Sequence, residues 1–301
     1  MNRVVAIIPA FNEEVALGSV ILRTSQYVDN IIVINDGSSD KTENVAKLAG
    51  AEIISHPKNL GKGQGLKSGF DLVESINSNS NENYDIIVTI DGDGQNNPDE
   101  IPNLISPIIN GEADFVNGSR YIEGFDGDDT PGYRRIGQKV LDKATNISSG
   151  LNITDSQSGF RAFSKNTIPF FKLNDSGFGI ESEMLSDAAE AGIKIVEVPI
   201  TVRYDLDGST ENPITHGVGV LLKIIKDMEF RRPIIYFTIP GFIIFLIGIV
   251  SGIWLLNDYL NGIIINFGIT VIVIILTILG LFLMLNGILL DSIRKLINKK
   301  L

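Results

Sequence analysis

The stretch Ile86-Ile87-Val88-Thr89-Ile90-Asp91-Gly92-Asp93-Gly94-Gln95 decides the fold of this chain. Its first half is a short apolar run rich in β-branched residues, typical of a buried strand, and it ends abruptly in two carboxylates and an amide. Open α/β sheets bind their ligands at the carboxyl ends of the strands. Oxygen donors without His or Cys suit Mg²⁺ or Mn²⁺, ions that usually hold a substrate diphosphate as well. We therefore predict a divalent metal site at Asp91, Asp93 and Gln95; the alternative is an ordinary acidic turn after the strand.

Two earlier apolar runs end in a similar way. Val4-Val5-Ala6-Ile7-Ile8 leads into Pro9-Ala10-Phe11-Asn12-Glu13-Glu14, where we expect Asn12 to cap a helix. Ile31-Ile32-Val33-Ile34 leads into Asn35-Asp36-Gly37-Ser38-Ser39-Asp40. Apolar strands that alternate with helical segments of this length predict an α/β fold with a mainly parallel sheet and flanking helices.

A glycine-rich segment, Gly61-Lys62-Gly63-Gln64-Gly65, precedes the next helix. Its spacing matches neither a Walker A loop nor a dinucleotide fingerprint. Two interpretations remain: the glycines ease the entry into the helix, or Lys62 lies near a bound phosphate.

The charges of the chain are distributed unevenly. Up to Pro233 there are 21 Lys and Arg against 34 Asp and Glu, a balance of −13, whereas the rest has 4 against 2. Nucleic-acid binding needs a basic face, so we expect no nucleic-acid partner. The chain has no cysteine, which excludes disulfides, thiolate zinc sites and cysteine nucleophiles.

The carboxyl-terminal part carries two long uncharged apolar segments, residues 234–256 and 263–290. Each is long enough to cross a hydrocarbon core of about 30 Å as a helix, so we predict a transmembrane hairpin across residues 233–290. Core helices of a soluble protein are the alternative. Lys and Arg flank both outer ends of the hairpin but are absent from its connection, which places residues 1–215 and the basic tail 291–301 in the cytoplasm. The amphipathic pattern over residues 216–232 predicts a helix on the membrane surface.

Taken together, five segments resemble the inverting family 2 glycosyltransferases of the GT-A fold, most closely the polyprenyl (dolichyl) phosphate sugar synthases. The resemblance covers roughly residues 3–230 and implies a Rossmann-like α/β domain, a nucleotide-sugar donor, Mg²⁺ or Mn²⁺, a polyprenyl phosphate acceptor and contact with membrane lipid. The matching segments are Ile8-Pro9-Ala10-Phe11-Asn12-Glu13-Glu14, Asn35-Asp36-Gly37-Ser38-Ser39-Asp40, Asp91-Gly92-Asp93-Gly94-Gln95, Gly118-Ser119-Arg120 and Ser158-Gly159-Phe160-Arg161-Ala162-Phe163.

The resemblance also implies roles for individual residues. The base and ribose of the donor would lie near Pro9, Phe11, Glu13 and Asp36. Asp91, Asp93 and Gln95 would surround the metal and diphosphate, with Lys62 or Arg203 assisting departure of the nucleotide diphosphate. Arg120 and Arg134 would hold the lipid phosphate, and Arg161 is a further cation available there. The chain departs from mannose-transferring members at Gly94, usually bulky, and at Gln138, usually Ser.

The expected function is therefore metal-dependent transfer of one sugar from a UDP- or GDP-sugar to a polyprenyl or dolichyl phosphate at the cytoplasmic face of a membrane. One alternative is a glycosyltransferase with a hydroxyl acceptor, which needs a general base. Another is a non-catalytic nucleotide-sugar-binding scaffold.

Overall fold

The computed structural model describes residues 2–79, 83–122, 132–174, 179–203, 233–264 and 266–298. They belong to two compact units, residues 1–224 and 225–301. The predicted surface helix, residues 216–232, lies outside the described residues.

The first unit is built on one seven-stranded sheet with strand order β3-β2-β1-β4-β6-β5-β7. Every pairing is parallel except those of β6, which runs antiparallel to both β4 and β5. The predicted mainly parallel α/β sheet is confirmed. The strands are β1 (Val4–Ala10), β2 (Asn30–Asn35), β3 (Glu52–Ser55), β4 (Ile86–Thr89), β5 (Phe115–Ser119), β6 (Arg161–Ser164) and β7 (Ile195–Pro199).

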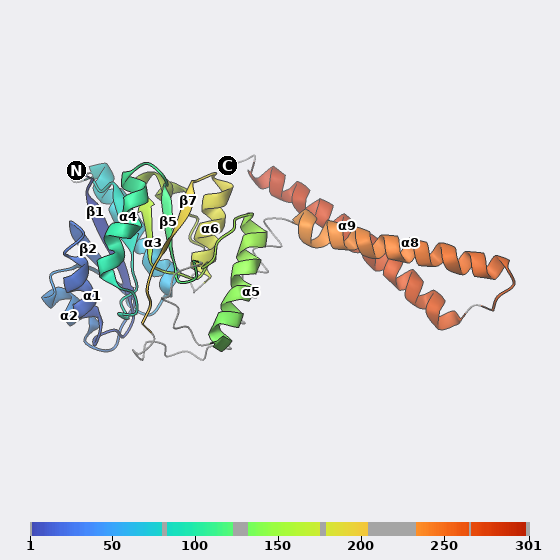
Figure 1. Cartoon of the computed structure of the whole chain (residues 1–301), viewed down its shortest axis with the longest axis horizontal. Coiled ribbons are helices and arrows are strands. Elements are labelled where there is room, and N and C mark those ends of the chain that lie inside the picture. The colour runs from blue at the N-terminus through green and yellow to red at the C-terminus, as the bar shows by residue number, and fades with distance from the viewer. Residues whose placement is uncertain are drawn as a thin grey trace. The chain divides into compact units, whose positions relative to one another are not determined.

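Helices cover both faces of the sheet (Figure 1). Successive side chains of a strand point to opposite faces, so Ala6 and Ile8 of β1 pack on one side and Val5 and Ile7 on the other. The first side is covered by α1, α2 and α4, and the second by α3 and α6. The helices are α1 (Leu17–Thr24), α2 (Thr42–Leu48), α3 (Lys62–Asn79), α4 (Ile101–Ile109), α5 (Gly132–Ser149) and α6 (Ile180–Glu190), with 3₁₀ turns η1 (Pro98–Glu100) and η2 (Lys165–Phe170).

The second face contains an aromatic cluster that fixes β6 between its neighbours. Phe163 of β6 packs with Phe70, Phe115 and Phe171, at centroid distances of 5.8, 4.6 and 5.3 Å. Phe163 is fully buried. Its burial holds the antiparallel strand beside β4, so the residues just before β6 lie next to the carboxyl end of β4.

The second unit is a helical hairpin (Figure 1). It contains the π-helical turn η3 (Ile234–Thr238), α8 (Ile239–Leu260) and α9 (Phe267–Asn298). The two long helices are long and apolar enough to cross a membrane by length and composition. They pack closely through glycines: a Cβ added at Gly241 would lie 2.5 Å from Met284 N, and one added at Gly280 would collide with Phe245 N.

The helix ends differ from the predicted bounds 234–256 and 263–290. The first helix continues to Leu260 because Asn257 and its neighbours form its last turn rather than the connection, and Gly262 follows at a positive φ of 76°. The second helix begins at Phe267 and extends through Asn298, so most of the predicted tail 291–301 continues the helix.

Candidate functional site

The carboxyl ends of β1, β2 and β4 meet at one edge of the sheet, where the order of the strands reverses. Parallel pairing brings the loops after Ala10, Asn35 and Thr89 together, because their strands run side by side. This is the switch point at which doubly wound sheets bind ligands.

The loop after β4 holds the predicted metal ligands. The backbone N–H of Gln95 donates to Asp93 Oδ1 at 2.9 Å, and Gly94 takes a positive φ of 76° that suits glycine. Asp91 Oδ1 lies 2.6 Å from Lys62 Nζ. The structure therefore places Lys62, at the start of α3, in the acidic site.

Lys62 has a second partner that the sequence did not predict. Its Nζ lies 2.8 Å from Oε1 of Glu181, on the first turn of α6. Glu181 is buried, and its Oε2 accepts no hydrogen bond from the part of the chain that the structure describes. The only signal in the sequence was an acidic residue at a helix start, which the helix dipole explains equally well.

Gly159 lies against this ion pair. A Cβ at position 159 would come within 2.6 Å of Asp91 Oδ2 and 2.7 Å of Lys62 Nζ. Thr89 Oγ1 donates to Gly159 O at 2.9 Å, which fixes this backbone over the end of β4. A side chain at position 159 would therefore have to displace the end of Asp91 or of Lys62.

The electrostatics of the site show an excess of negative charge. Burial, with added repulsion from Asp93 and Asp91, raises the pKa of Glu13 to about 7. Burial and the charge of Asp91 raise the pKa of Asp93 to about 6. Burial alone would lower the pKa of Lys62, but Asp91 and Glu181 outweigh it and raise the pKa.

A divalent cation fits this excess of carboxylates over cations. Among the residues that the structure describes, no three His, Asp or Glu side chains form a ready-made metal cage. Asp91, Asp93 and the amide of Gln95 are the residues that would supply oxygen ligands to Mg²⁺ or Mn²⁺, with a diphosphate and water completing the shell.

Asp36 organises the loop that leads to Lys62. Its carboxylate accepts from the N–H of Leu60 at 2.9 Å and of Gly61 at 2.8 Å, and contacts His56 Nδ1 at 2.7 Å. His56 Nε2 in turn contacts Ser68 Oγ at 3.0 Å. Asp36 therefore lies at the predicted edge but is buried and already bears three hydrogen bonds.

The loop after β1 differs from the prediction. Asn12 does not cap the helix, because α1 begins at Leu17 and Asn12 takes a positive φ of 57°. Its side chain instead accepts from the N–H of Ser39 at 2.9 Å and joins the first two loops. Pro9 is the penultimate residue of β1 at the same edge, and Phe11 is 41% exposed, leaving a ring surface for a planar base.

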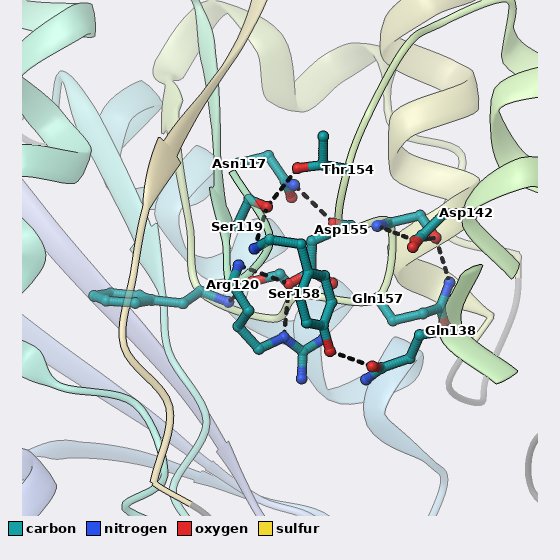
Figure 2. Close-up of polar contacts among 12 residues, drawn as sticks. Asn117, Ser119, Arg120, Gln138, Asp142, Thr154, Asp155, Gln157 and Ser158 are labelled. Carbon is teal, nitrogen blue, oxygen red and sulfur yellow. Dashed lines mark hydrogen bonds and ion pairs between the residues drawn. The ribbon is translucent and has the colours of Figure 1, made fainter. Parts of the chain in front are cut away.

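Arg120 follows β5 and is held by Asp155 (Figure 2). Its Nε and Nη2 lie 2.6 and 2.7 Å from the two carboxylate oxygens of Asp155, a bidentate pair. Asp155 is fully buried, and Asn117 Nδ2 donates to its carbonyl oxygen at 2.8 Å. The guanidinium also lies over the ring of Tyr121.

The other predicted cations have different positions. Arg134 belongs to the first turns of α5, and its side chain lies outside the described residues. Arg203 is exposed, and its N–H donates to Gln95 O at 2.9 Å.

Arg161 is not available to an acceptor. It is 1% exposed and donates to the carbonyl oxygens of Glu181 and Ser156, at 2.9 and 3.0 Å. Burial lowers the pKa of its guanidinium to about 10. Arg161 supports the site from inside by fixing the segments that carry Glu181 and Gly159.

The mainly parallel sheet, with an acidic loop after β4 beside the loops after β1 and β2 and an arginine after β5, has the GT-A fold. Residues 5–168 match the family described as Glycosyl transferase family 2. The chain belongs to this family and is a glycosyltransferase.

The names of some similar proteins specify a lipid phosphate as the acceptor. A UDP-N-acetylglucosamine–dolichyl-phosphate N-acetylglucosaminyltransferase of Methanococcus voltae is 33% identical over 72% of this chain and 90% of its own length. An undecaprenyl-phosphate mannosyltransferase of Micrococcus luteus is 31% identical over 66% of this chain and 83% of its own. Glucosyl-3-phosphoglycerate synthase of Mycobacterium tuberculosis, solved with Mn²⁺, UDP and glucosyl-3-phosphoglycerate, has a TM-score of 0.58 and 25% identity over 76% of this chain and 80% of its own.

Gly159→Ala should weaken Mn²⁺ binding by tenfold or more, because its methyl group would displace the Asp91 carboxylate or the Lys62 ammonium. Isothermal titration calorimetry of the full chain in detergent measures this. Gly137→Ala is the matched control, since its Cβ would meet no atom of the described residues within 4 Å. Equal affinity in the two variants would contradict the packing described here.

Mn²⁺ affinity should fall by about tenfold between pH 7.5 and pH 5.5, because protons at Asp93 and Glu13 compete with the metal. Raised pKa values in the folded state also mean that the metal-free protein loses stability as the pH rises through about 4 to 7. Because Mn²⁺ binds more tightly at pH 7.5 than at pH 5.5, it should also raise the Tm more at pH 7.5. A pH-independent affinity would show that these carboxyls do not bind or face the ion.

Proposed function

We propose that this chain transfers one sugar, with inversion, from a nucleotide diphosphate sugar to a polyprenyl phosphate at the cytoplasmic face of a membrane. The observation that carries the proposal is the presence, in one GT-A sheet, of a carboxylate-rich loop after β4 and an arginine, Arg120, held by Asp155 after β5. The relatives named for dolichyl and undecaprenyl phosphates support the acceptor class.

The donor would bind along the carboxyl ends of β1, β2 and β4. The exposed ring of Phe11 offers a stacking surface for the base, while Asp91, Asp93 and Gln95 would hold the metal. When bound, the ion acts as a Lewis acid for the charge that develops on the departing diphosphate. Lys62, whose ammonium contacts Asp91, adds a second positive charge beside the ion. Arg203 would add a third, because its backbone N–H is bonded to Gln95 O and its side chain therefore starts next to the metal loop.

The acceptor would bind beside Arg120 and the first turns of α5, which carry Arg134. A phosphate monoester needs no general base, because its second pKa is about 6 and it is largely ionised at neutral pH. It needs fixed cations instead. Asp155 holds the guanidinium of Arg120 by two short contacts, so its orientation is set before the lipid phosphate arrives.

The hairpin of α8 and α9 would anchor the enzyme where its lipid substrate lies. The apolar side chains along both helices are largely exposed in the structure, as expected for surfaces that contact lipid. Lys and Arg at both outer ends of the hairpin favour a cytoplasmic catalytic domain.

Arg134→Lys should raise the apparent KM for polyprenyl phosphate by about tenfold and change the donor KM by less than twofold, because a lysine cannot bind phosphate in a bidentate manner. The assay is transfer from radiolabelled UDP- and GDP-sugars to polyprenyl phosphate by purified protein in detergent. Asp93→Ala is the inactive control. Equally efficient glycosylation of a polyprenol would overturn the lipid-phosphate assignment.

Cysteine introduced at Asn257 should react with an impermeant thiol reagent in intact cells, whereas cysteine at Ser292 should react only after lysis. The native chain has no cysteine, so the background is clean. Labelling at position 292 and protection at 257 would reverse the proposed topology.

A further inference from the structure

A four-residue segment leaves β7 and runs along the metal loop. At its start, Ile200 N donates to Ser119 O at 3.0 Å, beside Arg120. At its end, Arg203 N donates to Gln95 O at 2.9 Å, and Val202 forms an antiparallel bridge with Asn96. The backbone of Arg203 is thus bonded to the residue whose amide is expected to bind the metal.

A carboxylate fixes the middle of this segment. Thr201 N donates to Oε1 and Oε2 of Glu100 at 3.1 and 3.0 Å, and Thr201 Oγ1 donates to Oε1 at 2.8 Å. The two residues are 101 positions apart in the sequence. Hydrogen bonds to a carboxylate are stronger than those to a neutral acceptor, so these three contacts hold Thr201 firmly on η1.

Glu100 itself stands on a rigid support. It ends the turn η1, which is capped by Asn97, and Asn97 Oδ1 accepts from Arg23 Nη2 of α1 at 2.5 Å. The next residue, Ile101, is fully buried in the core. Glu100 is therefore fixed relative to the core, and its hydrogen bonds fix Thr201 relative to the core as well.

We propose that Glu100 is a positioning residue for donor binding: by holding Thr201, it keeps the backbone of Arg203 against Gln95 and so places the guanidinium of Arg203 at the donor diphosphate. The inference rests on the proposed function for the identity of the donor. Without the contacts to Glu100, the segment would lose its hydrogen bonds to η1, and both the metal loop and Arg203 would lose a fixed neighbour.

The test compares Glu100→Ala with Asp99→Ala, a matched loss of the adjacent carboxylate. Asp99 is exposed and contacts Arg23 and Tyr27, away from the segment. Binding of UDP and of GDP in the presence of Mn²⁺ is measured by calorimetry on the full chain in detergent. Glu100→Ala should raise the Kd of the bound nucleotide about tenfold, whereas Asp99→Ala should change it by less than twofold. In the transfer assay, the donor KM should rise in the same ratio while the acceptor KM stays within twofold.

A second pair of variants keeps the test valid if Glu100→Ala does not fold. Thr201→Val removes the hydroxyl donor at nearly constant shape and should raise the Kd about threefold, and Thr201→Ser, which retains the hydroxyl, should restore it. A lower Tm with unchanged nucleotide binding, or equal effects of Glu100→Ala and Asp99→Ala, would show a purely structural role.

Wild-type protein that binds nucleotide but transfers no sugar to polyprenyl phosphate would overturn the proposed acceptor and leave the positioning role intact. Wild-type protein that binds neither nucleotide with Mn²⁺ would overturn both.

Discussion

The contacts of the Lys62 ammonium with Asp91 and Glu181 hold the site together. They join the start of α3, the end of β4 and the first turn of α6, three segments that are distant in the sequence. The ammonium is nearly buried, and its charge compensates those of the two carboxylates that contact it. The pair also sets the space in which Gly159 must lie, and it leaves the negative charge of Asp93 and Glu13 to be balanced by a divalent ion.

The antiparallel strand β6 makes this arrangement possible. It inserts between β4 and β5 and brings the segment 155–160 back over the carboxyl end of β4. Arg161, the first residue of β6, is buried and fixes the carbonyl oxygens of Ser156 and Glu181. One reversed strand therefore connects the acidic metal loop with Asp155, which orients Arg120.

The sequence predicted those features that depend on local patterns. Apolar runs that end in polar residues located the strand ends, and with them Asp91, Asp93 and Gln95. Glu181 was missed because an acid in a first helical turn carries no information about a partner 119 residues away. Asn12 and Arg161 were misjudged for a similar reason: a cap and a surface cation are the common local outcomes, whereas their actual partners, Ser39 and two buried carbonyls, are set by tertiary packing. The hairpin was predicted by hydropathy, but its turn was placed too early, because helix ends depend on features such as the positive φ of Gly262.

The central claim is that one divalent cation neutralises the loop Asp91-Gly92-Asp93-Gly94-Gln95 together with the donor diphosphate. Crystals of the full chain grown with Mn²⁺ and the nucleoside diphosphate that binds, measured at the manganese absorption edge, test it directly. One anomalous peak per chain is expected, within coordination distance of Asp93 and of the diphosphate oxygens. A peak elsewhere, or a bound nucleotide with no manganese between it and this loop, would contradict it.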